Sequence, residues 1–251
     1  MTITVTSDSG YVLDTLTVTD KNGDKVALTD RNDGTYTFTM PGSKVTVQAA
    51  FVKSEAQTTL SFTDVPADAY YYDAVRWAVE NGVTTGTSAT TFAPDGVCTR
   101  AQVVTFLWRA NGSPAPTAAV SPFADVSVGS YYYDAVLWAV EQEIAVGTSA
   151  TTFSPDNTLT AAQASAILLS ALGYNQNGEF GANGQFELNV TKWAQQAGLY
   201  KDLSVSATAG ISRDNTAQLI FNALANTTPV GYSALAESYY TVGSSALTGI
   251  V

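Results

Sequence analysis

Residues 62–102 read FTDVPADAYYYDAVRWAVENGVTTGTSATTFAPDGVCTRAQ, and residues 123–163 read FADVSVGSYYYDAVLWAVEQEIAVGTSATTFSPDNTLTAAQ. The two stretches align without a gap, 61 residues apart, and 25 of the 41 aligned positions are identical. Repetition at a fixed period indicates a structure built from copies of one small unit, each too small to bury a core alone. We therefore expect binding sites in the grooves between copies, in place of one catalytic pocket.

Each copy has the sequence pattern of a helix, a loop and a second helix. In the first copy, apolar residues recur with a period of about 3.6 over residues 69–81, and Gly82 suits a left-handed helix C-cap. Residues 99–102, Thr-Arg-Ala-Gln, form a capping-box pattern that predicts a second helix to about Ala110. The second copy repeats these signals and predicts helices near residues 131–143 and 160–173.

A third, degenerate copy follows the first two. Residues 192–199 resemble the end of a first helix, and residues 212–215 open a pattern that continues as a helix to Ala225. Residues 174–189 are rich in Asn, Gln and Gly, so we expect an irregular surface loop there. The tail from residue 227 has weak β character, typical of a loose end or the start of a further domain.

The N-terminal 53 residues show strand periodicity instead. Apolar and polar residues alternate over 11–19 and again over 45–51, and turn dipeptides such as Asn22-Gly23 separate the alternating runs. This pattern predicts a small antiparallel β module. Residues 54–60 are short and polar, as expected of a linker, and the period changes from 2 to about 3.6 after them.

Composition excludes several classes of function. The chain has 22 acidic and 11 basic residues and a net charge of −11, which argues against nucleic acid and against an anionic membrane surface as partners. It contains one cysteine, Cys98, and no histidine, so a Ser-His-Asp triad, a His-ligated metal and an internal disulfide are excluded. Two-carboxylate glycosidase chemistry remains open, but no acids cluster where a deep cleft is predicted. We expect a protein that is not an enzyme and needs no cofactor or metal.

The chain shows no signal for membrane insertion or export. It has no run of 18 apolar residues, so no membrane insertion is expected. No basic segment followed by an apolar one lies at the start, so no signal peptide is expected. The chain opens on Met1 almost inside a strand, which suggests a fragment.

Two family resemblances follow from these motifs. Residues 10–51 resemble the second half of the divergent internalin-B-type repeat of bacterial surface proteins. Over residues 61–226, the order Phe-x-Asp-Val, Tyr-Asp-Ala-Val, Gly, Thr-Phe-x-Pro-Asp and Thr-Arg-Ala resembles the S-layer homology domain, usually found in threes. The resemblance implies an α+β, multidomain chain. A small antiparallel β module would precede a mainly α-helical, pseudo-threefold bundle of three helix-loop-helix units. The implied segments are the β module (1–53), a linker (54–60), the three units (61–114, 115–173 and 174–226) and a tail (227–251).

The resemblance also implies a function. Members of the S-layer homology family bind secondary cell-wall polysaccharide, often carrying acidic pyruvyl ketals, and so fix a protein non-covalently to the wall. The expected location is therefore extracellular, at the cell wall or S-layer of a Gram-positive bacterium. The alternative is a degenerate scaffold that acts as an adhesion or protein-interaction surface, towards another surface protein or a host protein.

The family motifs place acidic and aromatic candidates for the glycan site. The Asp of Phe-x-Asp falls on Asp64 and Asp125, which would accept hydrogen bonds from sugar hydroxyls. The His-Trp pair of the family falls on Ala69-Tyr70 and Ser130-Tyr131, so the histidine is lost. The rings of Tyr70 and Tyr131 would stack on a sugar face.

The cationic candidates come from the start of each second helix. The family's Thr-Arg-Ala-Glu falls on residues 99–102, where Arg100 would pair with a ketal carboxylate through its planar fork. Free backbone N–H groups at a helix start also favour an anion. The third copy keeps the cation as Arg213, but the second has Ala161, and Gln102 stands in place of the family's Glu.

Each candidate has an alternative structural role. The arginines would be surface charges or packing stems, the aspartates would satisfy nearby backbone N–H groups, and the tyrosines would pack between lobes. Residues expected to be structural, in the core, are Trp77, Trp138, Trp193, Phe92, Phe153 and Cys98.

Overall fold

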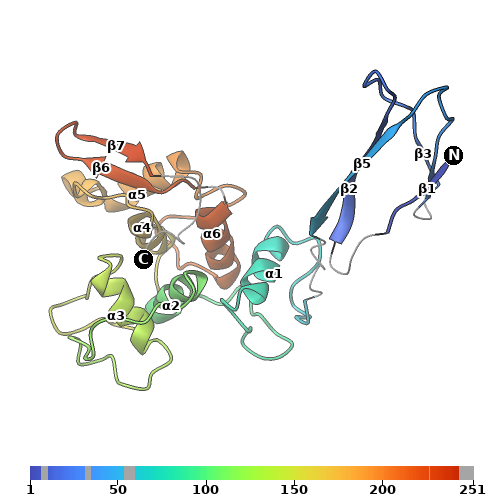
Figure 1. Cartoon of the computed structure of the whole chain (residues 1–251). Helices are drawn as coiled ribbons and strands as arrows, with labels where there is room; N and C mark the ends of the chain where they lie inside the picture. The colour runs from blue at the N-terminus through green and yellow to red at the C-terminus, as the bar shows by residue number, and fades with distance from the viewer. Residues whose placement is uncertain (7–10, 32–34, 54–59, 226, 243–251) are drawn as a thin grey trace. The chain divides into compact units, whose positions relative to one another are not determined.

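A computed structural model describes residues 1–6, 11–31, 35–53, 60–225 and 227–242 (Figure 1). The chain divides into two compact parts: a β module, Met1–Thr58, and a helical region, Thr59–Val251. The described residues contain small antiparallel sheets, six α-helices and one 3₁₀-helix. This composition confirms the mixed α and β class expected from the sequence.

The β module consists of two small sheets. Strand β4 (Thr35–Thr37) lies between β1 (Thr2–Thr4) and β3 (Thr29–Asp30) in an antiparallel three-stranded sheet. Strands β2 (Tyr11–Thr19) and β5 (Thr46–Lys53) form a separate antiparallel pair. The bounds of β2 match those predicted from the alternation. Such short ladders bury little, and Val18 and Phe38 supply the buried apolar side chains described in this module.

The expected turn at Asn22-Gly23 is present. The Asp20 carboxylate accepts hydrogen bonds from the backbone N–H groups of Asn22 and Asp24, at 2.8 and 3.0 Å. Gly23 has a φ of 88°, a left-handed conformation that a glycine adopts at little cost. Residues 54–59 of the predicted linker lie outside the described residues.

Both well-matched repeats form the predicted helix-loop-helix. The first unit contains α1 (Tyr72–Glu80) and α2 (Arg100–Ala110), and the second contains α3 (Tyr133–Glu141) and α4 (Ala161–Ala171). The predicted helices were a few residues too long because the segments before α1 and α3 are turns.

The helix ends repeat the same local geometry. The Thr99 side chain accepts a hydrogen bond from the backbone N–H of Gln102, whose Oε1 accepts one from the Thr99 N–H at 3.0 Å, and Thr160 opens α4 in the same way. These capping boxes confirm the prediction. At the end of α1, Gly82 has a φ of 68°, and Glu143 occupies the equivalent place after α3 with a φ of 57°.

The expectation of an irregular loop over residues 174–189 is wrong. The segment includes a 3₁₀-helix, η1 (Glu179–Gly184), and the start of α5 (Phe186–Gln196), with Phe180 buried. Burial of this ring orders a segment whose polar composition alone indicates a loop. Helix α6 (Arg213–Ala225) then follows as predicted.

Each first helix packs against the second helix of another unit. The principal helix contacts are α1 with α6, α3 with α2 and α5 with α4 (Figure 1). Helices α2, α4 and α6 also contact one another. A helix near the surface of one unit therefore completes the apolar packing of another, as expected when no copy buries a core alone.

Three backbone segments before α2, α4 and α6 close a ring of hydrogen bonds. The Cys98 N–H donates to the Ile211 carbonyl at 2.8 Å, and the Ile211 N–H donates to the Leu159 carbonyl at 2.9 Å. The Leu159 N–H returns to the Cys98 carbonyl at 3.3 Å. All three side chains are buried, so the ring lies within the core.

The remaining core predictions are largely confirmed. Phe92, Phe153 and Trp138 are buried, whereas Trp77 and Trp193 are partly buried against the same clusters. Cys98, discussed above, is buried as a free thiol.

The tail forms a hairpin on the helical region. Strands β6 (Val230–Ser233) and β7 (Ser238–Thr241) pair antiparallel. The Val230 N–H donates to the Leu172 carbonyl at 2.8 Å, and the Tyr239 ring packs against Tyr174 and Trp193. Within the described residues, no helix is long and apolar enough to cross a membrane.

Candidate functional site

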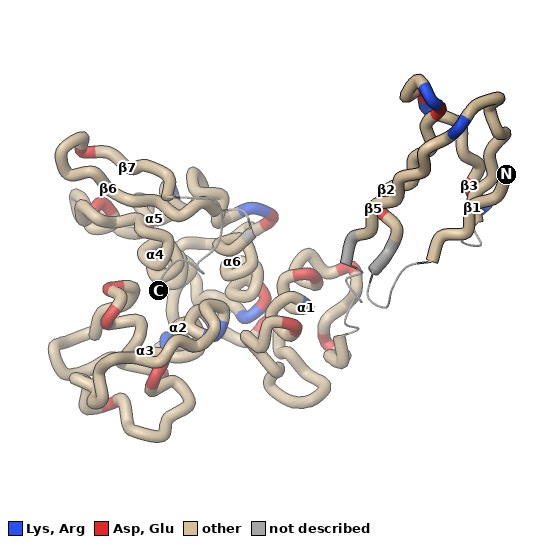
Figure 2. Tube along the Cα trace, in the orientation of Figure 1, with Lys and Arg blue, Asp and Glu red and all other residues tan. Residues whose placement is uncertain are grey.

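Positive charge is scarce in the helical region. Residues 60–251 include six Lys and Arg against fifteen Asp and Glu, and Figure 2 shows the basic positions as few among many acidic ones. An acidic ligand would therefore depend on individual cations. Arg100 and Arg213 begin α2 and α6. The expected free backbone N–H groups are absent there, because the N–H groups of Arg100 and Arg213 donate to the carbonyls of Asn157 and Gly96, at 2.8 and 2.9 Å.

Arg100 reaches from the first unit into the second. Its guanidinium carbon lies 4.5 Å from the centre of the Phe153 ring, and its Nη2 donates to the Val146 carbonyl. Its Nε is buried and has no hydrogen-bond partner among the described residues. Burial lowers the pKa of Arg100 from its usual value. The group nonetheless stays charged at neutral pH, because an arginine is not deprotonated in proteins.

Arg100 also lines a cavity of about 410 Å³. The opposite wall comes from Phe180 and Phe186, in η1 and α5. Gln163 and Asn175 add carboxamide groups. The Arg100 cation, the Glu143 carboxylate, two aromatic residues and neutral hydrogen-bonding groups thus line one space.

Arg213 repeats the contacts of Arg100 but is enclosed. Its Nε donates to the Phe92 carbonyl at 2.8 Å, and its guanidinium carbon lies 4.9 Å from the Phe92 ring and 5.1 Å from the Phe106 ring. Only 6% of its surface is exposed. Burial lowers the pKa of Arg213 from its usual value. Its donors therefore face protein groups, and it reaches a ligand only if the packing rearranges.

The two predicted tyrosines lie at boundaries between units. Tyr70 is 49% exposed, and its hydroxyl donates to Asp214 Oδ2 at 2.7 Å. Burial and this hydrogen bond raise the pKa of Tyr70 above its usual value. Tyr131 is 57% exposed, and burial raises its pKa while an interaction with the Thr99 side chain partly offsets the rise. Both rings keep an accessible surface.

The two predicted aspartates hold the loop before the buried phenylalanines. Asp64 accepts hydrogen bonds from the backbone N–H groups of Phe92 and Ala93, at 2.8 and 2.7 Å. Asp125 accepts equivalent bonds from Phe153 and Ser154, also at 2.8 and 2.7 Å. Burial favours the neutral acids, but the backbone donors outweigh it, and the pKa of each aspartate is lowered.

Gln102 is engaged in the capping box at the start of α2, so its Oε1 already has a donor. The structure brings the predicted residues together in two places. Arg213 precedes Asp214 in the chain, and Asp214 accepts the hydrogen bond from Tyr70. Arg100 lies over the ring of Phe153, whose backbone N–H donates to Asp125. Each grouping combines residues of two different units. Repeat spacing alone does not reveal that combination.

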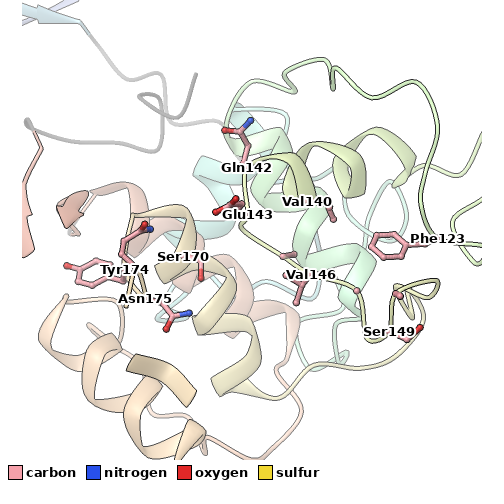
Figure 3. A pocket seen from close by; sticks show the side chains of 13 residues that line it. Phe123, Val140, Gln142, Glu143, Val146, Ser149, Ser170, Tyr174 and Asn175 are labelled. Atoms are coloured by element: carbon pink, nitrogen blue, oxygen red, sulfur yellow. The ribbon is translucent and has the colours of Figure 1, made fainter. Parts of the chain in front are cut away.

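A second, larger cavity was missed by sequence reasoning. It measures about 640 Å³ and shares Glu143, Ser170 and Asn175 with the Arg100 cavity. Figure 3 shows Tyr174 and Asn175 at one end and Phe123 and Ser149 at the other. The sequence contains an indication of this cavity, because the two repeats differ at residues that line it. Glu143 and Ser170 occupy the positions that Gly82 and Arg109 hold in the first repeat.

Comparison with known proteins identifies the constituent domains. Residues 61–104 and 122–165 match the family model of the S-layer homology domain, and residues 1–55 match that of the Divergent InlB B-repeat domain. The chain therefore contains two S-layer homology domains and a divergent InlB B-repeat, which confirms both resemblances for these segments. The third unit, residues 174–226, lies outside the matches and stays a prediction.

Similar proteins include three from bacteria. The chain is 49% identical over 53 residues to the Surface-layer 125 kDa protein of Lysinibacillus sphaericus, covering 21% of the chain and 4% of that protein. It is 30% identical over 170 residues to a Cell surface protein of Thermoanaerobacter kivui, covering 66% and 21%. An Endoglucanase of Bacillus sp. (strain KSM-635) is 30% identical over 133 residues, covering 53% and 14%. The chain thus spans about a fifth or less of these relatives.

Proposed function

We propose that residues 61–226 attach the protein to the bacterial cell wall by non-covalent binding of secondary cell-wall polysaccharide, without catalysis. The two S-layer homology domains and the relatives named as surface-layer and cell surface proteins indicate a location at the cell surface. The match to an endoglucanase covers only 14% of that protein, so it gives little support for enzymatic activity here.

The proposed architecture is a pseudo-threefold bundle with units at 61–114, 115–173 and 174–226. The cyclic helix contacts and the backbone ring through Cys98, Leu159 and Ile211 support it. Such an arrangement creates three boundaries between units, and a ligand bound at a boundary would contact two units at once.

The Arg100 cavity is the observation that carries the proposal. The positive charge of Arg100 favours an anion in this cavity, against the opposing charge of Glu143 on the same lining. Phe186, which is partly exposed, offers apolar surface to sugar C–H groups. An acidic ketal on a polysaccharide matches this combination, with its carboxylate on Arg100 and its ring on the aromatic wall.

The other predicted residues take two roles in this proposal. Tyr70 and Tyr131 present half-exposed rings for stacking. The remaining four already use their polar groups within the protein, so we assign them mainly to holding the boundaries in shape: Arg213, Asp64, Asp125 and Gln102.

Co-sedimentation with protein-free Gram-positive cell walls tests the proposal. The parent chain should pellet with the walls, whereas Arg100→Ala should stay in the supernatant. Lys192→Ala, which removes one positive charge at an exposed position outside the cavity, should pellet like the parent. Walls stripped of ketals by mild acid should bind the parent less.

The outcomes separate the rival functions. Pelleting of all three proteins would support wall attachment but reject Arg100 as the contact. If none pellets, the helical region is a scaffold, and the search moves to a surface or host protein as the partner.

A further inference from the structure

The cavity of about 640 Å³ lies within the size range of small-molecule sites. It is formed at the ends of α3 and α4, and the connection after α4 closes it. Figure 3 shows Val146 and Ser170 between its two ends, with Gln142 and Glu143 on one side.

At this cavity the second repeat has a short side chain where the first repeat has a long one. In the first unit, Arg109 extends across the equivalent space and its Nη1 donates to the Val83 carbonyl at 3.2 Å. The residue 61 positions later is Ser170. A serine is too short to make the corresponding bond to the Ile144 carbonyl, and Ser170 lines the cavity.

The second repeat also places an acid at the edge of this space. Glu143 has a left-handed backbone, with a φ of 57°, at the position after the helix C-cap, where the first repeat has Gly82. Side chains other than glycine rarely adopt this conformation, and strain of this kind recurs at binding sites. Glu143 is exposed, so its carboxylate is accessible to a ligand.

The far wall of the cavity is held in place before any ligand binds. Asn175 Oδ1 accepts a hydrogen bond from the Phe180 N–H at 2.9 Å, and the Gln176 N–H donates to the Tyr239 hydroxyl at 3.0 Å. The Tyr174 ring packs at 5.6 Å from Trp193 and 5.7 Å from Tyr239. Preorganisation of this kind favours specific binding.

We propose that this cavity binds a short amino-sugar oligosaccharide, with a protonated amine on Glu143. Glu143 is the one charged residue among the 13 described residues that line it. Neutral groups suited to sugar hydroxyls surround it, and apolar side chains suit the C–H face of a pyranose. These lining residues are Gln142, Ser149, Ser170, Asn175 and Gln176 for the polar part, and Phe123, Val140 and Val146 for the apolar part.

This inference goes beyond wall attachment through Arg100, because the charge it requires on the ligand is the opposite one. A carboxylate favours an ammonium group and disfavours a neutral acetamide at the same place. A sugar amine becomes protonated as the pH falls through its pKa, whereas an acetamide stays neutral. The ligand is therefore distinguished from its N-acetylated form by charge.

Isothermal titration of the full chain with a glucosamine trisaccharide at pH 5.5 tests the inference. We expect binding to the parent chain and clearly weaker binding of the N-acetylglucosamine trisaccharide. Ser170→Arg, which copies the residue that fills this space in the first unit, should abolish binding. Glu143→Gln should weaken it about tenfold, the size of one charge-assisted hydrogen bond.

Asp134→Asn is the matched control. It removes one negative charge from α3 at an exposed position outside the cavity lining, and should change the affinity by less than about twofold. Thermal unfolding of each variant checks that the fold is kept.

Three results would overturn the inference: no binding of the glucosamine trisaccharide, equal binding of the N-acetylated form, or binding unchanged by Ser170→Arg. Wall pelleting is a separate readout that depends on Arg100. Loss of trisaccharide binding with pelleting intact rejects this site alone, and loss of pelleting with trisaccharide binding intact rejects the wall proposal alone.

Discussion

The guanidinium carbon of Arg100 lies 4.5 Å from the centre of the Phe153 ring, so an arginine of one unit covers the anchoring aromatic residue of the next. Arg213 stands in the same relationship to Phe92, at 4.9 Å. Arg213 also lies 5.1 Å from the ring of Phe106, and its side chain is almost completely buried. Equivalent repeat positions thus hold a partly exposed arginine and an arginine enclosed by protein.

The two arginines should differ in their contribution to stability. Arg213→Ala loses two ring contacts and a hydrogen bond in a buried place, and should lower the free energy of unfolding by about 3 kcal/mol. Arg100→Ala should lower it by about 1 kcal/mol, because Arg100 lies over one ring and is less buried. Urea unfolding measures both values. Equal losses would contradict the distinction between the two sites.

Asp64 and Asp125 should make stability depend on pH at the acid end. Their pKa values are lowered in the folded chain, so each stabilises the fold above the unfolded value of about 3.9, and the effect is lost as pH falls through the folded pKa. Asp64→Asn should therefore be less stable than the parent at pH 7, and the gap should narrow below about pH 4.

The control for this experiment is Asp68→Asn, which removes an exposed charge from the same segment. Chemical unfolding at several pH values gives the comparison. A gap for Asp64→Asn that stayed constant down to pH 2 would mean that the backbone bonds to the carboxylate do not depend on its charge.

Replacing Glu143 should stabilise the chain only when glycine is introduced. Glu143→Gly removes the steric cost of a left-handed backbone and should raise the free energy of unfolding by about 1 kcal/mol. Glu143→Ala keeps that cost while removing the same carboxylate, so it should give no gain. A similar gain in both variants would assign the effect to charge.

The Tyr239 hydroxyl should matter for the tail. It donates to Glu179 Oε1 at 2.6 Å and accepts from the Gln176 N–H. Burial and the bond to Glu179 raise the pKa of Tyr239 to about 12, so this arrangement is stable across the neutral range. Tyr239→Phe should lower the free energy of unfolding by about 1–2 kcal/mol. Faster hydrogen exchange of the Gln176 amide would show that the lost stability comes from its bond to the Tyr239 hydroxyl.

Much of the fold follows from local patterns in the sequence. Alternation gave the bounds of β2, and the Thr-x-x-Gln signal located the starts of α2 and α4. These features are predictable because backbone geometry and neighbouring side chains decide them. The order within residues 174–189 was not predictable, since it depends on burial of the Phe180 ring by residues distant in the chain.

The candidate site was only partly predictable for the same reason. The repeat alignment identified Arg100 and Arg213 as equivalent, but which aromatic rings surround each is a property of the packing between units. The alignment also contained the exchange of Arg109 for Ser170. Its meaning became clear only when the Arg109 contact with Val83 was seen.

The backbone ring through Cys98, Leu159 and Ile211 has a consequence for how such modules can grow. Each of the three residues uses its N–H and its carbonyl on the other two, so the circuit is complete. An additional copy inserted into the chain would find these partners taken. In the proposed three-unit bundle, these residues therefore have no backbone group left with which to join a further copy.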